Sequence, residues 1–281
     1  MAMRRAVVLS ALGLGRTSPN PPVGCVIAGP DGDVVGEGFH ERKGGPHAER
    51  NALDAAGDRA AGGTAFVTLE PCCHHGRTPP CHQALLDAGV ARVVIGVLDP
   101  TSRGVGGAAL LRDAGVKVDV GALSDEVLVV LGTWLEAQER GRPRVICAYR
   151  EDAGGGGEPP AAVLAGLRST VDVVVGDGFT ATEGVPGAHG DFTVPRLRAE
   201  DGPLAALEAL YDGGARSVLV AGDRPLVEAF LAAELADEVR VWVSAPASGT
   251  PAEVPVAPAG FRVRAVQPVA GGVLVEAVSS G

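Results

Sequence analysis

The chain has 281 residues, of which 46% are hydrophobic and 21% charged, and its formal net charge is −10. This length and composition are ordinary for a soluble globular protein with one large domain or two modest ones. The acidic balance, with no run of basic residues, excludes a large polynucleotide as the expected partner, although one local arginine can still hold a small phosphorylated substrate.

The amino-terminal stretch MAMRRAVVLSALGLGRTSPN imitates a secretory signal, because two arginines precede an apolar run. The run is short and no small-residue cleavage site follows it, so we expect an amphipathic helix that ends near Gly13–Gly15. Nothing in the sequence approaches the eighteen apolar residues of a membrane span. Five cysteines, three of them close to histidines, favour metal binding over disulfides in a reducing compartment. We therefore expect a cytoplasmic protein without a membrane partner.

The first half of the chain predicts alternating strands and helices. Residues 22–40 predict two β-branched strands joined by the turn GPDG. Residues 47–60 predict a helix with Ala52, Leu53 and Ala56 on one apolar face. The elements expected next are a strand over 63–71, a helix over 79–91 that opens on prolines, a buried parallel strand over 92–100, a helix over 106–115, a strand over 116–121 and a helix over 124–140. This alternation is typical of a layered α/β domain.

A domain boundary is expected near 139–144, which divides the chain into domains at 1–140 and 141–281. The Gly- and Pro-rich segment 150–162 then predicts a loop or linker. The elements expected after it are strands over 170–176 and 216–222, helices over 203–214 and 224–237, a strand over 238–246 and a terminal hairpin over 261–278. The second domain is thus a smaller α/β unit.

Two segments of the first half contain the residue types that bind transition metals. GPHAERNAL (45–53) places His47 and Glu49 at the start of a helix. TLEPCCHHGRTPPCHQAL (68–85) places Cys72 after a strand and Cys81 at the start of the next helix. Three nitrogen and sulfur ligands on Zn²⁺ leave the fourth tetrahedral position to water, which is the arrangement of a catalytic site.

Glu49 fits the role of a proton shuttle beside such a metal. Bound zinc lowers the pKa of its water from about 15.7 towards about 7, and a glutamate that is not a ligand can move that water's proton to a leaving amine. Zinc deaminases carry the signature H-x-E…P-C-x-x-C. This chain has H-x-E and P-C, but His75 stands where the second cysteine is expected, and Cys81 is the nearest replacement.

The alternative is a closed structural zinc site. It would consist of Cys72, Cys81 and two of the three histidines His74, His75 and His82. Such a site leaves the H-A-E motif unexplained, which favours the open site. We interpret Cys73 as a packed or spare thiol, His75 and His82 as surface residues or supports for a ligand, and Cys25 as part of the core.

The string E-P-C-x-H-x-G-R-T-P-P-C resembles the deaminase half of the bifunctional riboflavin-biosynthesis protein family. The resemblance runs from about residue 6 to 125 and includes PNPPVG (19–24), GEGFH (36–40), GGPHAE (44–49) and GVLDP (96–100). It implies a cytidine-deaminase-like three-layer α/β/α domain. The activity that it implies is hydrolytic deamination of a diaminopyrimidinone ribotide.

The resemblance also implies a role for single residues. His47, Cys72 and Cys81 match the Zn²⁺ ligands, and Glu49 matches the proton shuttle. The substrate-binding positions that it implies are Asn20 and His40 in the pyrimidine pocket, His74 within the E-P-C-x-H string, and Arg77, whose fork would hold the sugar phosphate. Without the resemblance, Asn20 would be interpreted as a turn residue between prolines. Asp99-Pro100-Thr101 departs from the family's D-P-N and removes one expected ribose or phosphate contact.

The second half resembles the reductase of the same family, which has a dihydrofolate-reductase-like fold. Pieces of 167–180, 190–196 and 217–246 match, but the chemical landmarks are missing. YREDAGGGGEPP stands in place of a segment with lysine and S-x-D-G, and Ala221-Gly222-Asp223 stands in place of E-G-G. Glycines that let a backbone approach cofactor phosphates do not tolerate side chains. The resemblance therefore implies a shortened reductase-like domain that binds no NADPH.

Three hypotheses of function follow. The first is zinc-dependent deamination of 2,5-diamino-6-ribosylamino-4(3H)-pyrimidinone 5′-phosphate to the 5-amino-6-ribosylaminouracil phosphate, without reduction. The second is deamination of a related amino-heterocycle in a secondary-metabolite pathway, which the Thr101 departure favours. The third is a zinc-containing scaffold without catalysis, against which the intact H-A-E argues. The expected partner is a small aminopyrimidine nucleotide, and the chain is expected to form a homo-oligomer, most simply a dimer.

Overall fold

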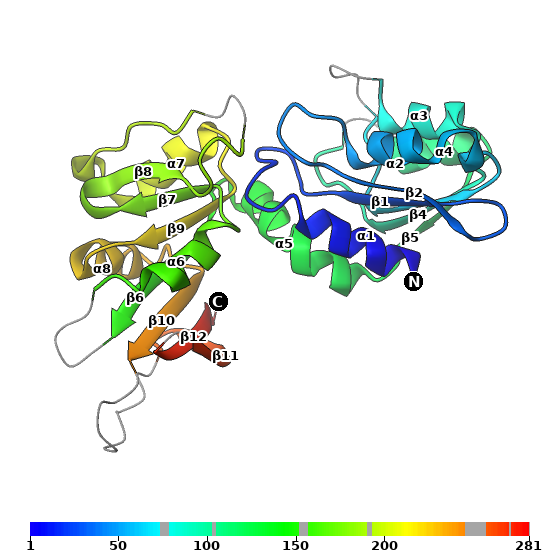
Figure 1. The fold of residues 1–281 in the computed structure, drawn as a ribbon. Helices are drawn as coiled ribbons and strands as arrows, with labels where there is room; N and C mark the ends of the chain where they lie inside the picture. Colours follow the sequence, from blue (N-terminus) through cyan, green and yellow to red (C-terminus); the bar gives the residue numbers. More distant parts are fainter. Residues whose placement is uncertain are drawn as a thin grey trace. The chain divides into compact units, whose positions relative to one another are not determined.

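The structure is a computed structural model that describes residues 1–73, 79–102, 105–151, 157–189, 193–244, 257–269 and 271–280. The chain divides into two compact units, Met1–Gln138 and Glu139–Gly281 (Figure 1). Among the described residues, none of the helices combines the length and the apolar character that crossing a membrane requires.

The first unit is built on a five-stranded sheet in the order β2-β1-β3-β4-β5. Its strands are β1 (Gly24–Ala28), β2 (Val34–Phe39), β3 (Thr64–Leu69), β4 (Arg92–Val97) and β5 (Lys117–Val120). Strand β1 is antiparallel to both of its neighbours, whereas β3, β4 and β5 run parallel. The parallel strands end at one edge of the sheet, so the loops that follow β3 and β4 lie side by side.

Helices cover both faces of this sheet. They are α1 (Ala2–Ala11), α2 (Ala48–Ala56) with a 3₁₀ turn η1 (Gly57–Ala60), α3 (Cys81–Asp87), α4 (Gly106–Asp113) and α5 (Ser124–Arg140). Figure 1 shows α2, α3 and α4 on one face and α1 and α5 on the other. The first unit is therefore the three-layer α/β/α domain that the sequence predicts.

Helix α2 packs unusually close to the sheet. A methyl group added to Gly36 would lie 2.2 Å from the carbonyl oxygen of Ala52, and one added to Gly38 would lie 2.4 Å from the amide nitrogen of the same residue. The facing residues Ala48, Ala52 and Ala56 are buried. Small residues on both elements thus allow backbone contact between the helix and the strand.

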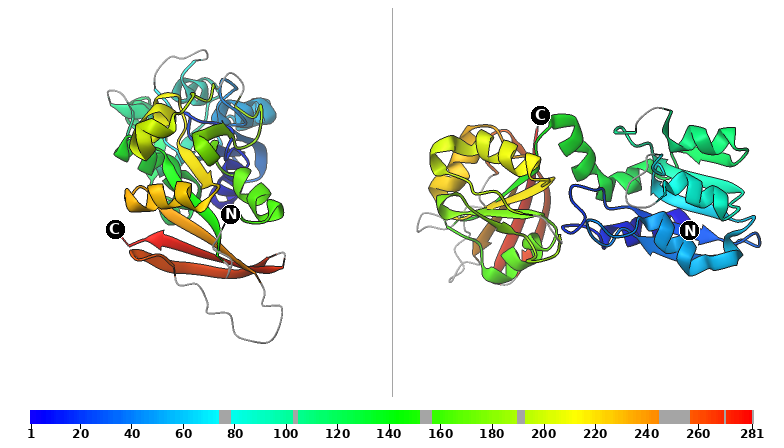
Figure 2. Two further views of the ribbon diagram at one scale, coloured as in Figure 1. Left: turned by 90° about the vertical axis from the view of Figure 1, so that its left-hand side faces the viewer. Right: turned by 90° about the horizontal axis from the view of Figure 1, so that it is seen from above.

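The second unit is built on a seven-stranded sheet in the order β11-β12-β10-β6-β9-β7-β8. Its strands are β6 (Arg144–Glu151), β7 (Val173–Gly176), β8 (Thr180–Glu183), β9 (Ser217–Ala221), β10 (Glu238–Ser244), β11 (Phe261–Val269) and β12 (Gly272–Ser279). The four central strands β10, β6, β9 and β7 are parallel. Strands β11 and β12 form a hairpin at one edge of the sheet (Figure 2).

The helices of the second unit are α6 (Ala161–Arg168), α7 (Gly202–Asp212) and α8 (Arg224–Ala232), with 3₁₀ turns η2 (Asp177–Phe179) and η3 (Ala199–Asp201). Leu164 of α6 packs with Ala148 and Leu219. Leu207 of α7 and Phe230 of α8 pack in a separate cluster. One short helix therefore covers one face of the sheet, and two helices cover the other.

Most of the elements predicted from the sequence are confirmed, but β6, α6 and β8 have no counterpart among them. The predicted linker overlaps the last residues of β6 and the first residues of α6. The prolines expected in the first turn of a helix precede it instead, because Pro80 is the N-cap and α3 begins at Cys81.

Two carboxylates hold the amino ends of the parallel strands of the second unit. Asp172, just before β7, accepts hydrogen bonds from the amides of Arg216 and Ser217 at 2.8 and 2.9 Å. Its other oxygen lies 3.1 Å from Nε2 of His189, which is fully buried. Asp237, just before β10, accepts from the amide of Val145 in β6 at 2.8 Å and pairs with Arg140 and Arg142.

We expect Asp172→Ala to lower the free energy of unfolding of the second unit by about 3 kcal/mol or more, because it leaves two backbone amides and an imidazole without their acceptor. Urea unfolding followed by Trp242 fluorescence in a Trp134→Phe background checks this, since the chain has two tryptophans. The exposed Asp212→Ala is the control and should change stability by less than about 0.5 kcal/mol. Equal effects of the two substitutions would contradict the assignment.

Candidate functional site

The amino end of α2 presents two side chains of the predicted site. His47 is the N-cap residue with extended backbone (φ −72°, ψ 162°), and Glu49 lies in the first helical turn. Glu49 is only 3% exposed. The Asn51 amide donates a 2.8 Å hydrogen bond to the carbonyl oxygen of Phe39, which ties α2 to the end of β2.

The two cysteines come from the carboxyl edge of the sheet and the helix that follows. Cys72 lies three residues beyond β3, and Cys81 is the first residue of α3. The amide of Cys81 donates to Sγ of Cys72 at 3.3 Å. His82 donates to the carbonyl oxygen of Cys72 from its backbone amide at 3.3 Å and from Nδ1 at 3.2 Å. His82 therefore supports Cys72.

His47, Cys72 and Cys81 form one group whose ligand atoms all lie within 4.8 Å of one another. Nδ1 of His47 is 3.6 Å from Sγ of Cys72 and 3.3 Å from Sγ of Cys81. Zinc bonds of about 2.0 Å to nitrogen and about 2.3 Å to sulfur, at tetrahedral angles, separate the two atoms by about 3.5 Å. The donor set and its spacing therefore fit a zinc ion with one position left open.

Contacts among the three metal-ligand residues shift the pKa values of their side chains. The Cys81 thiol and His47 hydrogen-bond to the Cys72 sulfur and lower its pKa to about 4. The hydrogen bond to Cys72, which acts against the effect of burial, raises the pKa of His47. Donation to Cys72, together with burial, raises the pKa of Cys81. One thiolate is thus stabilised even by the protein groups alone.

Glu49 lies against this group. Burial, and next the negative charge of Cys72, raise the pKa of the Glu49 carboxyl to about 7. The Cys81 thiol hydrogen-bonds to the same carboxyl. A carboxyl group with a pKa near neutrality can both accept and donate a proton at physiological pH.

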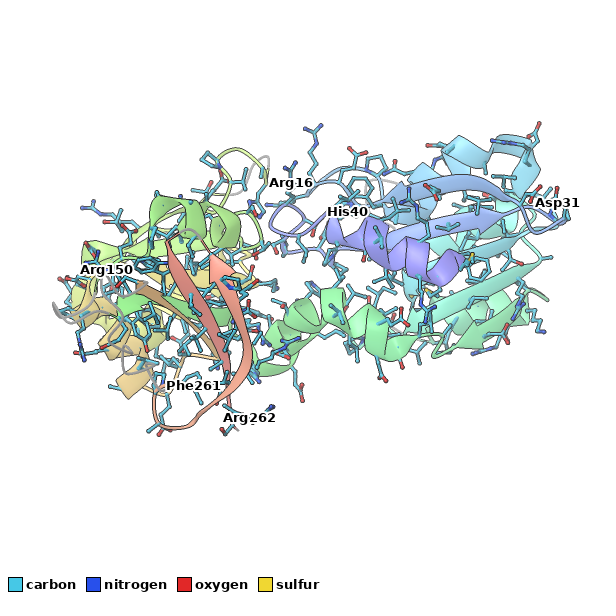
Figure 3. All side chains as sticks on the ribbon, turned by 60° about the horizontal axis from the view of Figure 1, so that its bottom comes forward. Arg16, Asp31, His40, Arg150, Phe261 and Arg262 are labelled. Carbon is cyan, nitrogen blue, oxygen red and sulfur yellow. The ribbon has the colours of Figure 1, made fainter. Side chains whose placement is uncertain are left out.

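Asn20 and His40 meet beside the metal-ligand group. The carbonyl oxygen of Pro46 accepts from Nδ1 of His40 at 2.9 Å, so Nε2 is the acceptor for the Asn20 amide at 3.1 Å. His40 is 2% exposed, and burial is the main cause that lowers its pKa. Its ring packs edge-on against that of His47 at 5.4 Å. His40, at the end of β2 (Figure 3), is therefore a neutral imidazole in one tautomer.

The other sequence-predicted residues divide into three groups. His74, His75 and Arg77 lie outside the described residues. Cys73 is half-buried and is not a member of the metal-ligand group, and Cys25 is buried within β1, as predicted. The hydroxyl and amide of Thr101 both donate to Asp99 Oδ1, at 2.7 and 2.8 Å.

Two residues that support the site, Trp134 and Glu70, were not predicted from the sequence. Trp134 of α5 donates from Nε1 to the carbonyl oxygen of Pro19 at 2.8 Å and thereby holds the segment that carries Asn20. Glu70 is a buried carboxylate between β3 and Cys72. Its place within E-P-C is a signal that the sequence analysis left unused.

The zinc-binding region of cytidine and deoxycytidylate deaminases matches residues 1–97 of the chain. A diaminohydroxyphosphoribosylamino-pyrimidine deaminase of Buchnera aphidicola (from Acyrthosiphon pisum) is 53% identical over 125 residues, which are 44% of this chain and 84% of the relative. The chain belongs to this deaminase family. Zinc is the cofactor that the family match and the donor set both support.

Longer relatives of the deaminase family match as well. The riboflavin biosynthesis protein RibD of Escherichia coli is 49% identical over 144 residues, 51% of this chain and 39% of the relative. The RibD of Actinobacillus pleuropneumoniae is 48% identical over 154 residues, 54% of this chain and 41% of that protein. The matched part of the chain thus spans about two fifths of these longer relatives.

The fold of both units agrees with a solved structure of this family. A crystal structure of a diaminohydroxyphosphoribosylaminopyrimidine deaminase/5-amino-6-(5-phosphoribosylamino)uracil reductase from Thermotoga maritima matches with a TM-score of 0.79 and 27% identity. The match covers 99% of this chain and 97% of that chain. The predicted fold class, a cytidine-deaminase-like domain followed by a second α/β domain, is confirmed.

We expect Cys72→Ser to retain less than about a tenth of the wild-type zinc after dialysis against a chelator, because a three-ligand site tolerates no missing thiolate. The adjacent Cys73→Ser is the matched control and should retain the full amount. Metal content measured by atomic emission checks both variants. Equal zinc loss from the two variants would mean that the ligand set is wrong.

Proposed function

We propose that the chain is a zinc-dependent aminohydrolase of riboflavin biosynthesis that deaminates 2,5-diamino-6-ribosylamino-4(3H)-pyrimidinone 5′-phosphate. The observation that carries this proposal is the buried Glu49 carboxyl beside the open His47–Cys72–Cys81 site. The name of the Buchnera relative supports the same substrate class. In the proposed division, residues 1–140 perform the deamination and residues 141–281 form a shortened reductase-like domain.

In the proposed reaction, water adds to C2 of the pyrimidine, the bond to the exocyclic nitrogen breaks and ammonia leaves. Zinc, when bound, supplies the Lewis acidity that lowers the pKa of water to about 7. Glu49 accepts one proton from the water and delivers it to the ring nitrogen. It then takes the second proton of that water, from the hydroxyl now at C2, and delivers it to the departing amine, so that a carbonyl forms at C2 as ammonia leaves. Burial of Glu49 keeps bulk water from competing for these protons and raises the pKa of its carboxyl, which suits a group that must both accept and donate a proton.

Asn20 and His40 are the proposed contacts to the pyrimidine. Because the Asn20 amide donates to the neutral His40 ring, its Oδ1 remains an acceptor for an amino or ring N–H group of the substrate. Arg77 is proposed to bind the sugar phosphate, and His74 is proposed as a further contact to the substrate. The proposal for Arg77 and His74 is based on the family motif.

We expect Glu49→Gln to lower kcat for ammonia release from the ribotide by at least about 100-fold while zinc content stays at the wild-type level. The amide preserves the shape of the side chain but cannot carry the proton. Asp54→Asn, on the exposed side of the same helix, is the control and should keep wild-type activity. Wild-type kcat in Glu49→Gln would exclude the shuttle role.

The second candidate is deamination of a related amino-heterocycle. It is favoured by Thr101, which stands where the family pattern has asparagine. The Thr101 hydroxyl donates to Asp99, whereas an asparagine amide at this position is expected to reach the ribotide. Comparison of kcat/KM for the ribotide with that for free aminopyrimidines separates the two candidates. Zinc-loaded protein that deaminates neither would support the scaffold alternative.

We also propose that the protein is a homodimer in the cytoplasm. Sedimentation of the full chain would test the homodimer.

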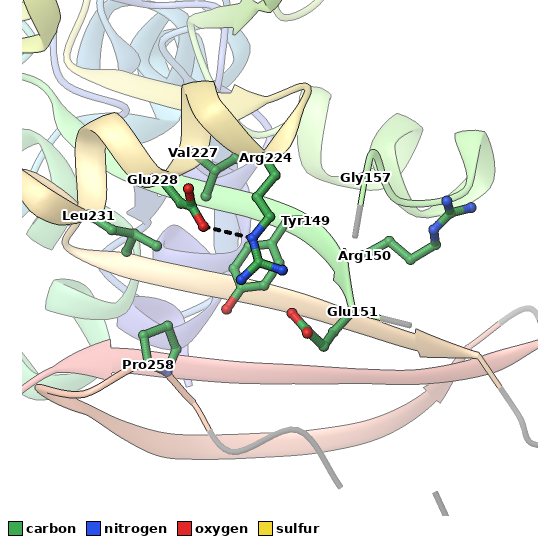
Figure 4. Close-up of a pocket in the computed structure, with 9 residues that line it drawn as sticks. All are labelled: Tyr149, Arg150, Glu151, Gly157, Arg224, Val227, Glu228, Leu231 and Pro258. Carbon is green, nitrogen blue, oxygen red and sulfur yellow. Dashed lines mark hydrogen bonds and ion pairs between the residues drawn. The ribbon is translucent and has the colours of Figure 1, made fainter. Parts of the chain in front are cut away.

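We further propose that the second unit binds no NADPH. Asp223 caps α8 and accepts from the Leu226 amide at 3.0 Å, and its own amide donates to Asp177 at 2.6 Å. Two carboxylates therefore occupy the helix end at which a dinucleotide phosphate would bind. Nearby, a cavity of about 240 Å³ beside α8 contains Arg224, which is already paired with Glu228 at 2.6 Å (Figure 4).

We expect the wild type to release ammonia from the ribotide at the same rate with and without NADPH. We also expect it to oxidise no NADPH. Addition of the protein should not change NADPH fluorescence at cofactor concentrations up to about 1 mM. A Kd of about 1 mM corresponds to a binding free energy near −4 kcal/mol. Consumption of NADPH during turnover would show that the reductase is intact.

A further inference from the structure

Glu70 is a buried carboxylate that collects hydrogen bonds from the loop after the neighbouring strand. It is 7% exposed and stands directly after β3. Oε2 accepts from the amide of Asp99 and from the hydroxyl of Ser102, both at 3.2 Å. Oε1 accepts from the amide of Ala108 in the first turn of α4 at 2.9 Å. One carboxylate thus binds both ends of the β4–α4 connection.

Two glycines let α4 begin directly on the metal-ligand segment. Gly106 has φ +77°, and a methyl group added to it would lie 2.5 Å from Oε1 of Glu70. A methyl group added to Gly107 would lie 1.9 Å from the carbonyl oxygen of Pro71, the residue between Glu70 and Cys72. The start of α4 is therefore in backbone contact with the segment that delivers a metal ligand.

The contact lies at the edge of the sheet where ligands of α/β proteins bind. Strands β3 and β4 are parallel and end together, with Leu69 opposite Val97. Ligands bind outside the carboxyl ends of such strands. Asp99–Ser102 and Cys72 therefore border the same site from neighbouring strands.

We infer that Glu70 is a positioning residue that holds the loop Asp99–Ser102 and the start of α4 against the metal-ligand segment, and thereby sets the affinity for the substrate. Glu70 itself touches neither the reacting atoms nor the group of metal ligands. The effect on substrate affinity rests on the proposed deaminase function, whereas the effect on the loop does not.

The role requires a carboxylate. Both oxygens of Glu70 face backbone N–H donors, Asp99 on one side and Ala108 on the other. A glutamine has one acceptor oxygen and one NH₂ group, so either orientation of its amide sets donor against donor. Glu70→Gln therefore breaks the bridge at one end without changing the volume of the side chain.

The experiment compares Glu70→Gln, Ser102→Ala and Ser102→Thr in the full-length, zinc-loaded chain. Hydrogen exchange of one of the two amides, Asp99 or Ala108, should accelerate at least about tenfold in Glu70→Gln, which corresponds to the loss of one hydrogen bond to a charged group. KM for the ribotide should rise by a similar factor in Glu70→Gln, and less in Ser102→Ala. In all three variants kcat and zinc content should change less than about twofold. Ser102→Thr keeps the hydroxyl and should reverse most of the Ser102→Ala effect.

Asp119→Asn is the matched control, because Asp119 on β5 forms an ion pair with Arg92 on β4, away from this edge of the sheet. It should leave exchange and KM unchanged. Wild-type amide exchange in Glu70→Gln would overturn the proposal, and so would a loss of kcat and zinc with unchanged KM. If the wild type releases no ammonia, the proposed function fails, and amide exchange alone then decides whether Glu70 holds the loop.

Discussion

The close packing of α2 against β2 is the constraint on which the site depends. His47 and Glu49 lie at the amino end of this helix, whereas Cys72 follows β3 and Cys81 begins α3. Backbone contact at Gly36 and Gly38 sets the depth of the helix on the sheet. A side chain at either glycine would clash with the backbone of α2 and shift the helix whose amino end carries His47 and Glu49.

Burial and hydrogen bonding then shift the pKa values of the groups that this packing brings together in different directions. The same environment that raises the pKa of Glu49 also holds His40 neutral, whereas hydrogen bonding keeps Cys72 charged. The site thus contains a carboxyl group with a raised pKa, a neutral hydrogen-bonding ring and a thiolate within one small volume. Zinc adds a positive charge to this arrangement without any need for a lysine or arginine inside it.

The chemistry of the site could be predicted from the sequence better than its support. His47, Glu49, Cys72 and Cys81 lie in two short strings that match the pattern of zinc deaminases, so their convergence could be predicted. Trp134 acts through a hydrogen bond to the Pro19 carbonyl, and Glu70 through three hydrogen bonds from the loop after β4 and from α4, all distant in sequence. Such contacts depend on the tertiary structure and leave no periodic pattern.

Strand β6, which was not predicted from the sequence, illustrates the same difference. Strand β6 lies at the centre of the second sheet, yet it is bordered by Gly- and Pro-rich sequence that is typical of a linker. Local composition outweighed the apolar run of Val145, Cys147 and Ala148, which is buried between strands on either side. The two strands that flank it, β9 and β10, lie about seventy and about ninety residues further along the chain.

In the second unit, Asp172 and Asp237 hold the amino ends of all four central strands, while α8 begins at the opposite edge. The carboxylates that hold the strands together therefore lie at the opposite end of the strands from the start of α8. In evolutionary terms, substitutions can accumulate at the carboxyl edge without passing through an unfolded ancestor. The same separation makes this unit a scaffold on which a new binding edge can be selected while its framework is left untouched.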